Sequence, residues 1–479
     1  MDVVVTGFDL SQAAVVTVGR ERQRVVLADG VRERLEAACR TLDRAVASGA
    51  PVYCVSVGAG ASKASSVDPL ARERFERLLV RNSLVGQGPV VDPAAIRGTL
   101  LVIVNLLAAG RAAVRIETVQ RLVAALNDDR LPPVPLLGSL GQADLAPLSH
   151  LIFGIVGDEP LRSGEAVALT STNAFSTGLA VFALHDAQAL LGTLTASAGL
   201  AFEGFRANPS PLHPAVEQVR PYAGLARARQ GLERALAGSR LHVPGEPRNL
   251  QDPLSFRNAA HVLGAAHDAL AHASAQLAVE LNAHQSNPLV LADSGEVVSV
   301  ASFEALPVAL ALDYARLGLA AAITSSAERV VKLLQRSHSG LPSGLRYAPV
   351  AELALEVFAT AAVALAGEAR LLAAPVSNEL PSTSLEDGIE DRMTFAPLAA
   401  RRLAEQVELG TRIAAIELIC AGEAIEIRRA LGQAVDPLGE GARQTLALLR
   451  RHLEPVGPLG DVPTELEPLL ADLRGGALA

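Results

Sequence analysis

Apolar residues recur at helical spacing along most of the chain. In residues 31–47 they fall on one face, with arginine and glutamate at the other positions, and residues 69–82, 93–109 and 116–127 show the same amphipathic pattern. Longer segments of helical character follow at residues 177–204, 252–283, 303–334, 350–372 and 397–431. The pattern therefore predicts a protein built mainly from α-helices.

Runs of β-branched residues interrupt this pattern near the N-terminus. The runs 3–5, 25–27 and 52–57 are bounded by glycine or aspartate, and they predict three short strands. Together with helix 31–47, they are expected to form a small N-terminal α+β part. A loop of small residues, 58–68, follows, and loops of this kind often cover functional sites.

Two of the later helical segments are apolar on more than one face. These are residues 361–366 and residues 413–427. A helix that is apolar all round is normally buried. Either the helical domain is very large, or helices of other subunits cover these faces, and we favour oligomerisation.

The composition agrees with a large folded core. Of the 479 residues, 50% are hydrophobic and 19% are charged, which excludes wholesale disorder. The net charge of −9 argues against a general nucleic-acid or anionic-membrane surface. Only three cysteines occur, at positions 39, 54 and 420, so neither a disulfide framework nor a cysteine-rich zinc site is expected.

Several other classes of function lack their sequence signals. The N-terminus has no basic region of the kind that begins a signal peptide, and apolar stretches such as 357–367 fall short of the ~20 residues that span a bilayer. The histidines show no metal-binding spacing, and there is no nucleotide-binding glycine motif. We therefore expect a soluble, cytoplasmic protein without metal, cofactor, nucleic-acid partner or membrane association.

A glycine-rich turn stands before an apolar helix, in the segment 138–150, which reads GSLGQADLAPLSH. Asp144 is a plausible N-cap, and Pro147 falls in the first helical turn, where its missing N–H does no harm. The N–H groups of residues 141–143 would then lie at a helix N-terminus. They either bind an anion or oxyanion, or they form a closed structural turn.

This segment resembles the signature of the histidine and phenylalanine ammonia-lyase family. Other family motifs are matched in the same order at residues 51–60 (PVYCVSVGAG), 251–257 (QDPLSFR), 280–289 (ELNAHQSNPL), 339–342 (SGLP), 399–402 (AARR) and 416–418 (IEL). The match extends from about residue 3 to about residue 430.

The resemblance implies a mainly α fold with a bundle of long antiparallel helices, as in ammonia-lyases and aminomutases. It also implies a homotetramer whose active sites combine residues of several subunits. On this basis we divide the chain into an N-terminal domain (1–200), a central long-helix bundle (201–435) and a C-terminal helical tail (436–479).

One departure from the family bears directly on the chemistry. The family makes its electrophile from an internal Ala-Ser-Gly triplet, which cyclises and dehydrates to a methylidene-imidazolone. Here Gly141 is followed by Gln142, Ala143 and then Asp144. Ala143 has no hydroxyl that could leave, and no glycine follows it. We expect a degenerate loop without the prosthetic group.

The resemblance also implies roles for pocket residues. Tyr53 occupies the position of the general base, Arg257 that of the group binding the substrate carboxylate, and Glu390 that of an acidic pocket residue. A tyrosine base needs a field that lowers its pKa from about 10, and the glycine-rich loop and helix N-termini are candidates to supply it. The other implied substrate-binding residues are Ser83, Ser171, Asn173, Gln251, Leu254 and Phe303.

Several of these positions depart from the family pattern. Ser83 stands where histidine lyases carry a histidine, Leu254 replaces a tyrosine, and Glu304 stands where a histidine is common. Ser171 falls near the position of the family's active-site asparagine, and Asn173 substitutes for it if the register slips by two residues.

Each main candidate also has a purely structural interpretation. Tyr53 could cap a strand, Arg257 could pair with Asp252 or Glu280, and Glu390 could be one of several solvated loop charges.

Two functions remain open. In the first, the chain is an enzyme of specialised metabolism in which Tyr53 moves a proton during elimination or addition, isomerisation or cyclisation of a carboxylate- or carbonyl-bearing small molecule. In the second, it is an inactive lyase homologue that acts as a scaffold, a ligand sensor or the partner of an active paralogue. Retention of Tyr53, Gln251 and Arg257 favours the enzyme, because a scaffold does not need them.

Overall fold

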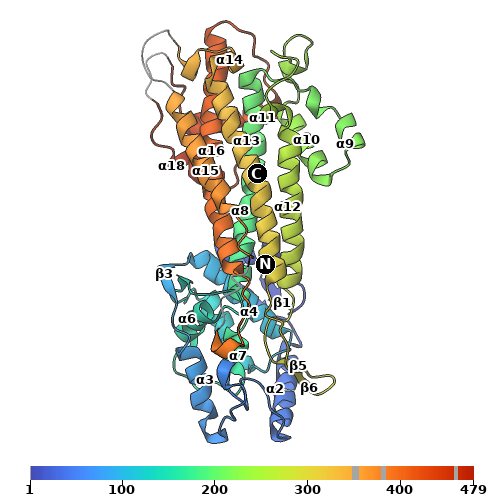
Figure 1. The fold of residues 1–479 in the computed structure, drawn as a ribbon, viewed down its shortest axis with the longest axis vertical. Coiled ribbons are helices and arrows are strands. Elements are labelled where there is room, and N and C mark those ends of the chain that lie inside the picture. The colour runs from blue at the N-terminus through green and yellow to red at the C-terminus, as the bar shows by residue number, and fades with distance from the viewer. Residues whose placement is uncertain (1, 348–354, 379–384, 458–461) are drawn as a thin grey trace. The chain divides into compact units, whose positions relative to one another are not determined.

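The computed structural model describes residues 2–347, 355–378, 385–457 and 462–479. These residues form two compact units, and neither unit is continuous in sequence (Figure 1). The first unit comprises Met1–Ala183, Ala273–Asp313 and Pro375–Arg401, and the second comprises Leu184–His272, Tyr314–Ala374 and Arg402–Ala479. The described residues are mostly helical, which confirms the predicted fold class of long helices with a small N-terminal α+β part.

The first unit begins with a two-stranded parallel sheet, in which Val3 pairs with Val25. Its core lies around helix α4, which packs against α1 and α5 and buries Ile96, Leu100, Leu101, Ile103 and Leu107. The elements of this region are β1 (Val3–Val5), α1 (Gln12–Arg20), β2 (Val25–Leu27), α2 (Val31–Ala47), α4 (Pro93–Ala108) and α5 (Ile116–Asn127).

The rest of the first unit carries three of the segments that resemble lyase motifs, at residues 51–60, 138–150 and 280–289. Two antiparallel pairs, β3 with β4 and β5 with β6, lie among short helices. These elements are η1 (Gly60–Ser62), η2 (Pro69–Ala71), α3 (Arg72–Arg81), β3 (Gln87–Val90), β4 (Pro135–Leu137), α6 (Leu145–Val156), α7 (Glu165–Thr170), β5 (Leu289–Leu291), β6 (Glu296–Val298) and η6 (Glu386–Gly388).

Long helices dominate the second unit and form a bundle. Four helices cross the division between the two units: α8 (Ala174–Phe205), α12 (Ala259–Glu280), α13 (Leu306–Leu334) and α16 (Ala396–Ala430). The other helices of the second unit are α9 (Ala215–Val219), α10 (Ala223–Ala235), α11 (Leu254–Arg257), α14 (Arg336–Ser339), α15 (Glu356–Leu372), α17 (Glu440–His452) and α18 (Glu467–Arg474), with short 3-10 turns η3 (Ser210–Leu212), η4 (Arg240–His242) and η5 (Ser343–Leu345).

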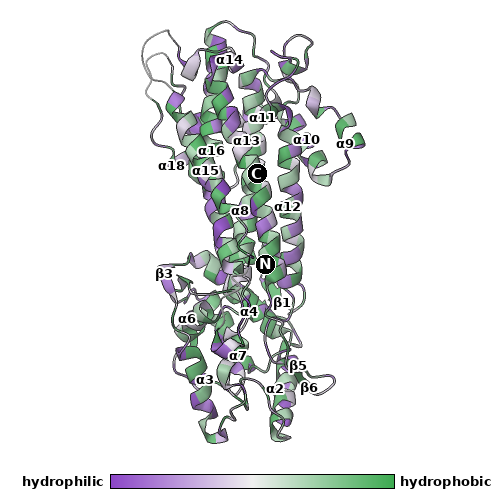
Figure 2. Cartoon of the chain, in the orientation of Figure 1, coloured by the Kyte–Doolittle hydropathy of each residue, from purple (hydrophilic) through white to green (hydrophobic). Residues whose placement is uncertain are grey.

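The two segments expected to be apolar all round differ in their surroundings. Residues 413–427 of α16 are buried by the chain itself, and Ile413 and Ile425 are fully inaccessible. Helix α15 buries only three alanines and leaves Val363 and Leu371 52% and 76% exposed. Figure 2 shows that hydrophobic and hydrophilic residues alternate along the long helices. Of these two segments, α15 is the one that exposes large apolar side chains in the described part of the chain.

Two helical stretches, Glu165–Phe205 and Leu306–Leu334, are long and apolar enough to cross a membrane by length and composition. This corrects the expectation that no apolar stretch reaches such a length. In both stretches most of the apolar window, 89% and 61%, is buried inside the chain, as in the core helices of a large bundle.

The strand expected at residues 52–57 does not form. The carbonyl of Val52 instead accepts the N–H groups of Val55, Ser56 and Val57, which closes a compact turn. Cys54 adopts a left-handed conformation with φ of +56°, which a strand does not contain. The β-branched composition therefore indicated the wrong element. The N–H groups that would pair with a neighbouring strand donate instead to the carbonyl of Val52.

Candidate active site

The turn at residues 141–144 lies in the first unit and is tightly packed. Gly141 has φ of +77°, and a β-carbon at this position would collide with the Thr394 hydroxyl and the backbone of Ala396. The Thr394 hydroxyl donates a 2.7 Å hydrogen bond to the carbonyl of Gly141. Ala143 also has positive φ, at +58°. The turn therefore requires glycine at position 141, and Thr394 holds it in place.

The N–H groups of this turn bind protein acceptors. Gly141 donates to the Ser139 hydroxyl at 3.1 Å, Ala143 donates to Oδ1 of Asn173 at 3.2 Å, and Asp144 donates to the carbonyl of Thr172 at 2.7 Å. These three groups are not free for an anion. Two of the three residues whose N–H groups were expected to bind an anion, Gly141 and Ala143, thus use those groups within the protein.

Asp144 stands at the N-cap position of α6, but its side chain does not cap the helix. The carboxylate is fully buried and accepts hydrogen bonds from the Ser139 hydroxyl (2.6 Å) and from the N–H and hydroxyl of Ser176 (2.7 and 2.9 Å). Burial raises the pKa of Asp144 in spite of these bonds. Asp144 is therefore a tertiary anchor between the turn and the start of α8, and the expected capping bond is absent.

Gln142 joins the turn to the beginning of α13. Its backbone forms an antiparallel bridge with Glu304, and its Nε2 donates a 3.0 Å hydrogen bond to Glu304 Oε2. Glu304 Oε1 accepts the N–H of Leu306, and Oε2 lies 3.5 Å from Nε of Arg392. The Oε1 atom of Gln142 is buried and has no hydrogen-bond partner among the described residues. The two departures from the family pattern, Gln142 and Glu304, thus contact each other.

Asn173 connects this turn to Phe303. It is fully buried, its Nδ2 donates to the carbonyl of Phe303 at 2.5 Å, and its N–H donates to Oε1 of Gln285 at 3.1 Å. Ser171 instead ends α7, where its N–H bonds the carbonyl of Val167. Of the two residues proposed for the asparagine position, the structure brings Asn173 to the turn.

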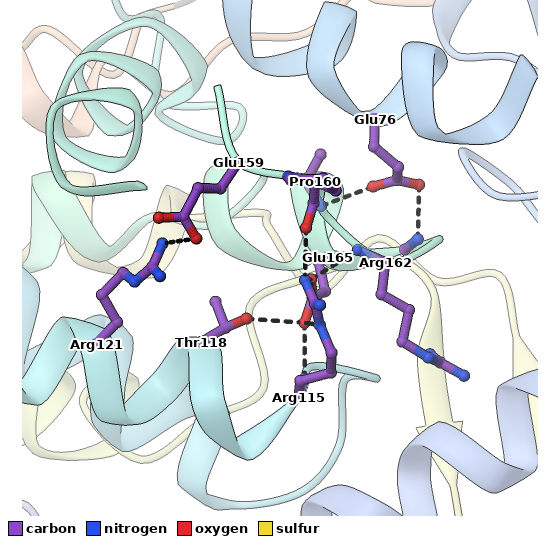
Figure 3. A network of polar contacts seen from close by, with 10 residues as sticks. Glu76, Arg115, Thr118, Arg121, Glu159, Pro160, Arg162 and Glu165 are labelled. Atoms are coloured by element: carbon purple, nitrogen blue, oxygen red, sulfur yellow. Dashed lines mark hydrogen bonds and ion pairs between the residues drawn. The ribbon is translucent and has the colours of Figure 1, made fainter. Parts of the chain in front are cut away.

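A network of buried carboxylates holds α7 in place just before Asn173 (Figure 3). Glu165 is fully buried and accepts hydrogen bonds from the backbone and guanidinium of Arg115 and from the hydroxyl of Thr118. Glu76 of α3 accepts the N–H groups of Gly164 and Ala166 at 2.7 and 2.8 Å. Burial raises the pKa of Glu76 to about 7. This network positions α7, and it contains none of the predicted site residues.

Tyr53 is half-buried in the turn at residues 52–57. Its hydroxyl oxygen accepts the N–H of Gly60 at 3.1 Å. Burial raises the pKa of Tyr53 to about 12, with a smaller contribution from Cys54, and the Gly60 N–H lowers it only in part. The glycine-rich loop therefore does not supply the pKa-lowering field that a tyrosine base requires. Tyr53 is a neutral phenol at physiological pH.

Glu390 lies near the same loop. Burial raises its pKa, and the neighbouring carboxylates of Glu386 and Asp391 raise it further. Glu386 also contacts the Tyr53 loop, since its Oε2 accepts the N–H of Ala61 at 3.2 Å. Ser83 lies just beyond α3, where its hydroxyl donates to the carbonyl of Leu79 in an ordinary helix-terminal bond.

Gln251, Leu254 and Arg257 belong to the second unit. Arg257 Nη1 donates to Oε1 of Gln251 at 2.6 Å, and Leu254 is 59% exposed. The carboxylate of Asp252 is used by Asn208 and Asn249 instead. Within the described part of this unit Arg257 has no carboxylate partner, so the ion pair with Asp252 does not form.

Some residues of the site were not predicted from the sequence. Thr394 and Arg392 follow Glu390 closely, and Gln285 lies within the matched segment 280–289, so their proximity to known motifs was the available signal. Across the described ranges, no group of three or more histidine, cysteine, aspartate or glutamate side chains is arranged to hold a metal ion.

A model of the aromatic amino acid lyase family matches residues 10–164 and 159–451. The chain belongs to this family. Histidine ammonia-lyase of Symbiobacterium thermophilum is 32% identical over 506 aligned positions that cover 100% of this chain and 98% of the relative. Histidine ammonia-lyase of Deinococcus radiodurans is 31% identical, covering 88% of this chain and 85% of the relative.

Solved structures of family members have the same fold. Ergothionase from Treponema denticola, an ergothioneine-degrading enzyme, superimposes with a TM-score of 0.91 at 25% identity, covering 99% of this chain and 98% of that one. Tyrosine aminomutase from Streptomyces globisporus gives a TM-score of 0.89 at 25% identity, covering 100% of this chain and 98% of that one.

The turn of this lyase-family chain does not fit the methylidene-imidazolone group. Cyclisation would require the nitrogen of Asp144 to attack the carbonyl of Gln142, yet its N–H is engaged with the carbonyl of Thr172. Dehydration would require a hydroxyl on residue 143, which is alanine. The residues present therefore provide neither the free nucleophile nor the leaving group.

Proposed function

We propose that this member of the aromatic amino acid lyase family is an enzyme that works without the methylidene-imidazolone group. Its substrate is a small molecule with a carboxylate or carbonyl, and its reaction is an addition or elimination, an isomerisation or a cyclisation. The observation that carries the proposal is the contact between Gln142 and Glu304. A turn that had only lost a function would not need a specific, half-buried polar pair at this position.

Tyr53 is proposed as the group that moves the proton. Because its pKa is raised to about 12, the resting enzyme holds a neutral phenol, which donates a proton before it accepts one. This favours a first step in which a proton is delivered to an unsaturated or carbonyl-activated substrate. Glu390, with its raised pKa, is a second candidate for proton transfer near the same loop.

The substrate carboxylate is assigned to Arg257. Its guanidinium has no carboxylate partner in the described part of the second unit, and Gln251 orients it through one nitrogen. A guanidinium suits bidentate binding of a carboxylate. The exposed Leu254 beside it favours an apolar substituent on the substrate.

We further propose that the protein is a homotetramer and that it lies in the cytoplasm. The homotetramer is supported by the face of α15, where Val363 and Leu371 are exposed although the helix is apolar. Apolar helix faces of this kind commonly mark contacts between subunits. Size measurement in solution tests this assignment independently of activity.

The experiment compares metabolite profiles after incubation of a small-molecule extract with the wild-type protein or with Tyr53→Phe. Tyr222→Phe, at an exposed tyrosine of the second unit, is the matched control. We expect a substrate to disappear and a product to appear with the wild type and the control, and neither change with Tyr53→Phe. No change in the extract with any of the three proteins would favour a scaffold, sensor or partner of an active paralogue, whereas unchanged turnover by Tyr53→Phe would remove Tyr53 from the mechanism.

Free L-histidine and L-phenylalanine are included as substrates, with the unsaturated acid followed by its absorbance. The proposal predicts no deamination of either amino acid. Efficient deamination would show that the ordinary lyase chemistry survives, and it would overturn the assignment of a reaction without the prosthetic group.

A further inference from the structure

The short helix α11 is held by two anchors, one through a side chain and one through its backbone. The first anchor is Phe256, which is fully buried and stacks on Phe205 with 4.2 Å between ring centroids. Phe202 contacts the same ring edge-on at 5.7 Å. This aromatic cluster fixes the Phe256 side chain of α11.

The second anchor is the carbonyl of Ser255. It accepts Nη1 of Arg329 at 3.2 Å and the hydroxyl of Ser325 at 3.3 Å, and both donors come from α13. Arg329 is 1% exposed, so its guanidinium is confined to this position. One buried side chain of the bundle thus reaches the backbone two residues before Arg257.

The rest of the Arg329 guanidinium is bound to Glu417 of α16. Nε and Nη2 donate to the two carboxylate oxygens at 2.5 and 3.0 Å, and the hydroxyls of Ser197 and Ser326 donate to Glu417 Oε2. Both charges are thereby satisfied inside the bundle. A buried ion pair of this kind is weak evidence for stability, since a well-packed apolar pair often does as well.

We infer that Arg329, oriented by Glu417, is a positioning residue that fixes α11 so that Arg257 presents its guanidinium to a substrate carboxylate. A helix of four residues has too few internal hydrogen bonds to hold its own geometry. Binding of a carboxylate by a guanidinium depends on placement to within a fraction of an ångström. This inference rests on the proposed role of Arg257 in binding substrate.

The decisive variant is Arg329→Lys in the full-length protein. Lysine keeps a cation beside Glu417, but a single ammonium cannot reproduce the fork that also reaches Ser255. We expect hydrogen exchange at the N–H groups of Phe256 and Arg257 to become about tenfold faster. We also expect the affinity for 3-phenylpropanoate, an apolar carboxylate probe measured by calorimetry, to fall about tenfold.

Ser197→Ala is the matched control, because it removes a hydrogen bond to Glu417 without touching Ser255. Ser197→Ala should leave hydrogen exchange at Phe256 and Arg257 and the affinity for the probe at the wild-type level. Its thermal stability should fall about as much as that of Arg329→Lys. Ser325→Ala, which removes the second donor to Ser255 and the hydroxyl that accepts Arg329 Nη1 while leaving the bonds to Glu417 in place, replaces Arg329→Lys if that variant fails to fold. Wild-type exchange at Phe256 and Arg257 in the tested variant would overturn the inference, as would an equal increase in Ser197→Ala.

Arg257→Ala separates this inference from the proposed function. If Arg257→Ala abolishes probe binding and Arg329→Lys does not weaken it, the positioning role is wrong and the carboxylate site stands. If the wild type does not bind the probe, or Arg257→Ala binds it normally, the assignment of the carboxylate site is wrong, and the exchange measurement still decides whether Arg329 fixes α11.

Discussion

The buried carboxylate of Glu76 makes a quantitative prediction about stability and pH. Its side chain is 1% exposed, and burial raises its pKa from 4.5 to about 7 although two backbone N–H groups favour the charged form. Because each pKa unit corresponds to about 1.4 kcal/mol, ionising Glu76 in the folded protein costs roughly 3 kcal/mol more than in the unfolded chain.

The direction of the pH effect on stability follows from whether the folded or the unfolded chain holds the proton of Glu76. Between pH 4.5 and pH 7 the folded protein retains the proton of Glu76 and the unfolded chain loses it, so stability decreases as pH rises through this window. Glu76→Gln cannot ionise. We therefore expect the variant to be close to the wild type at pH 4.5 and to gain, relative to it, roughly 3 kcal/mol by pH 8.

The assay is urea unfolding of wild type and Glu76→Gln at several pH values between 4.5 and 8. Glu73→Gln, at an exposed position of the same helix, is the control and should follow the wild-type curve. Identical pH dependence in wild type and Glu76→Gln would refute the reasoning, because it would mean that the carboxylate is hydrated or paired in the folded state.

Two further predictions concern the bundle and the turn. Glu417→Ala leaves the Arg329 charge buried without a partner, so unfolding by urea should show a loss of about 3–5 kcal/mol, most of which the apolar pair Arg329→Met with Glu417→Leu should restore. The intact mass of the purified chain should equal that of the unmodified sequence, and a loss of two waters mapped to residues 141–144 would contradict the absence of the prosthetic group.

Local periodicity predicted many of the elements well. The helices at 31–47 and 116–127 and the strands at 3–5 and 25–27 have the predicted bounds, because an amphipathic or β-branched run and its flanking residues are visible within a short window. The run at 52–57 failed because its hydrogen bonds closed on the carbonyl of Val52, and composition does not report which acceptor a backbone N–H will find.

The candidate site could be predicted only as a set of positions. Ordered motifs pointed to Gln142, Asn173 and Phe303, but the choice of Asn173 over Ser171 depends on contacts between residues up to 130 positions apart. The pKa of Tyr53 is likewise a property of burial, which no motif specifies.

The buried Oε1 atom of Gln142 provides a test that distinguishes an active site with changed chemistry from an inactive scaffold. A buried acceptor without a partner costs about 1–3 kcal/mol, and a scaffold has no reason to retain that cost. In Gln142→Met this penalty disappears, while the lost bond to Glu304 costs about 1.5–3 kcal/mol, so the two effects nearly cancel.

We therefore expect Gln142→Met to keep the melting temperature of the wild type within a few degrees. If the amide oxygen accepts a hydrogen bond from the substrate, the same variant loses the product found in the metabolite assay. Unchanged product formation would show that Oε1 meets no ligand. A large loss of stability would show instead that the amide is satisfied in the free protein and serves the fold.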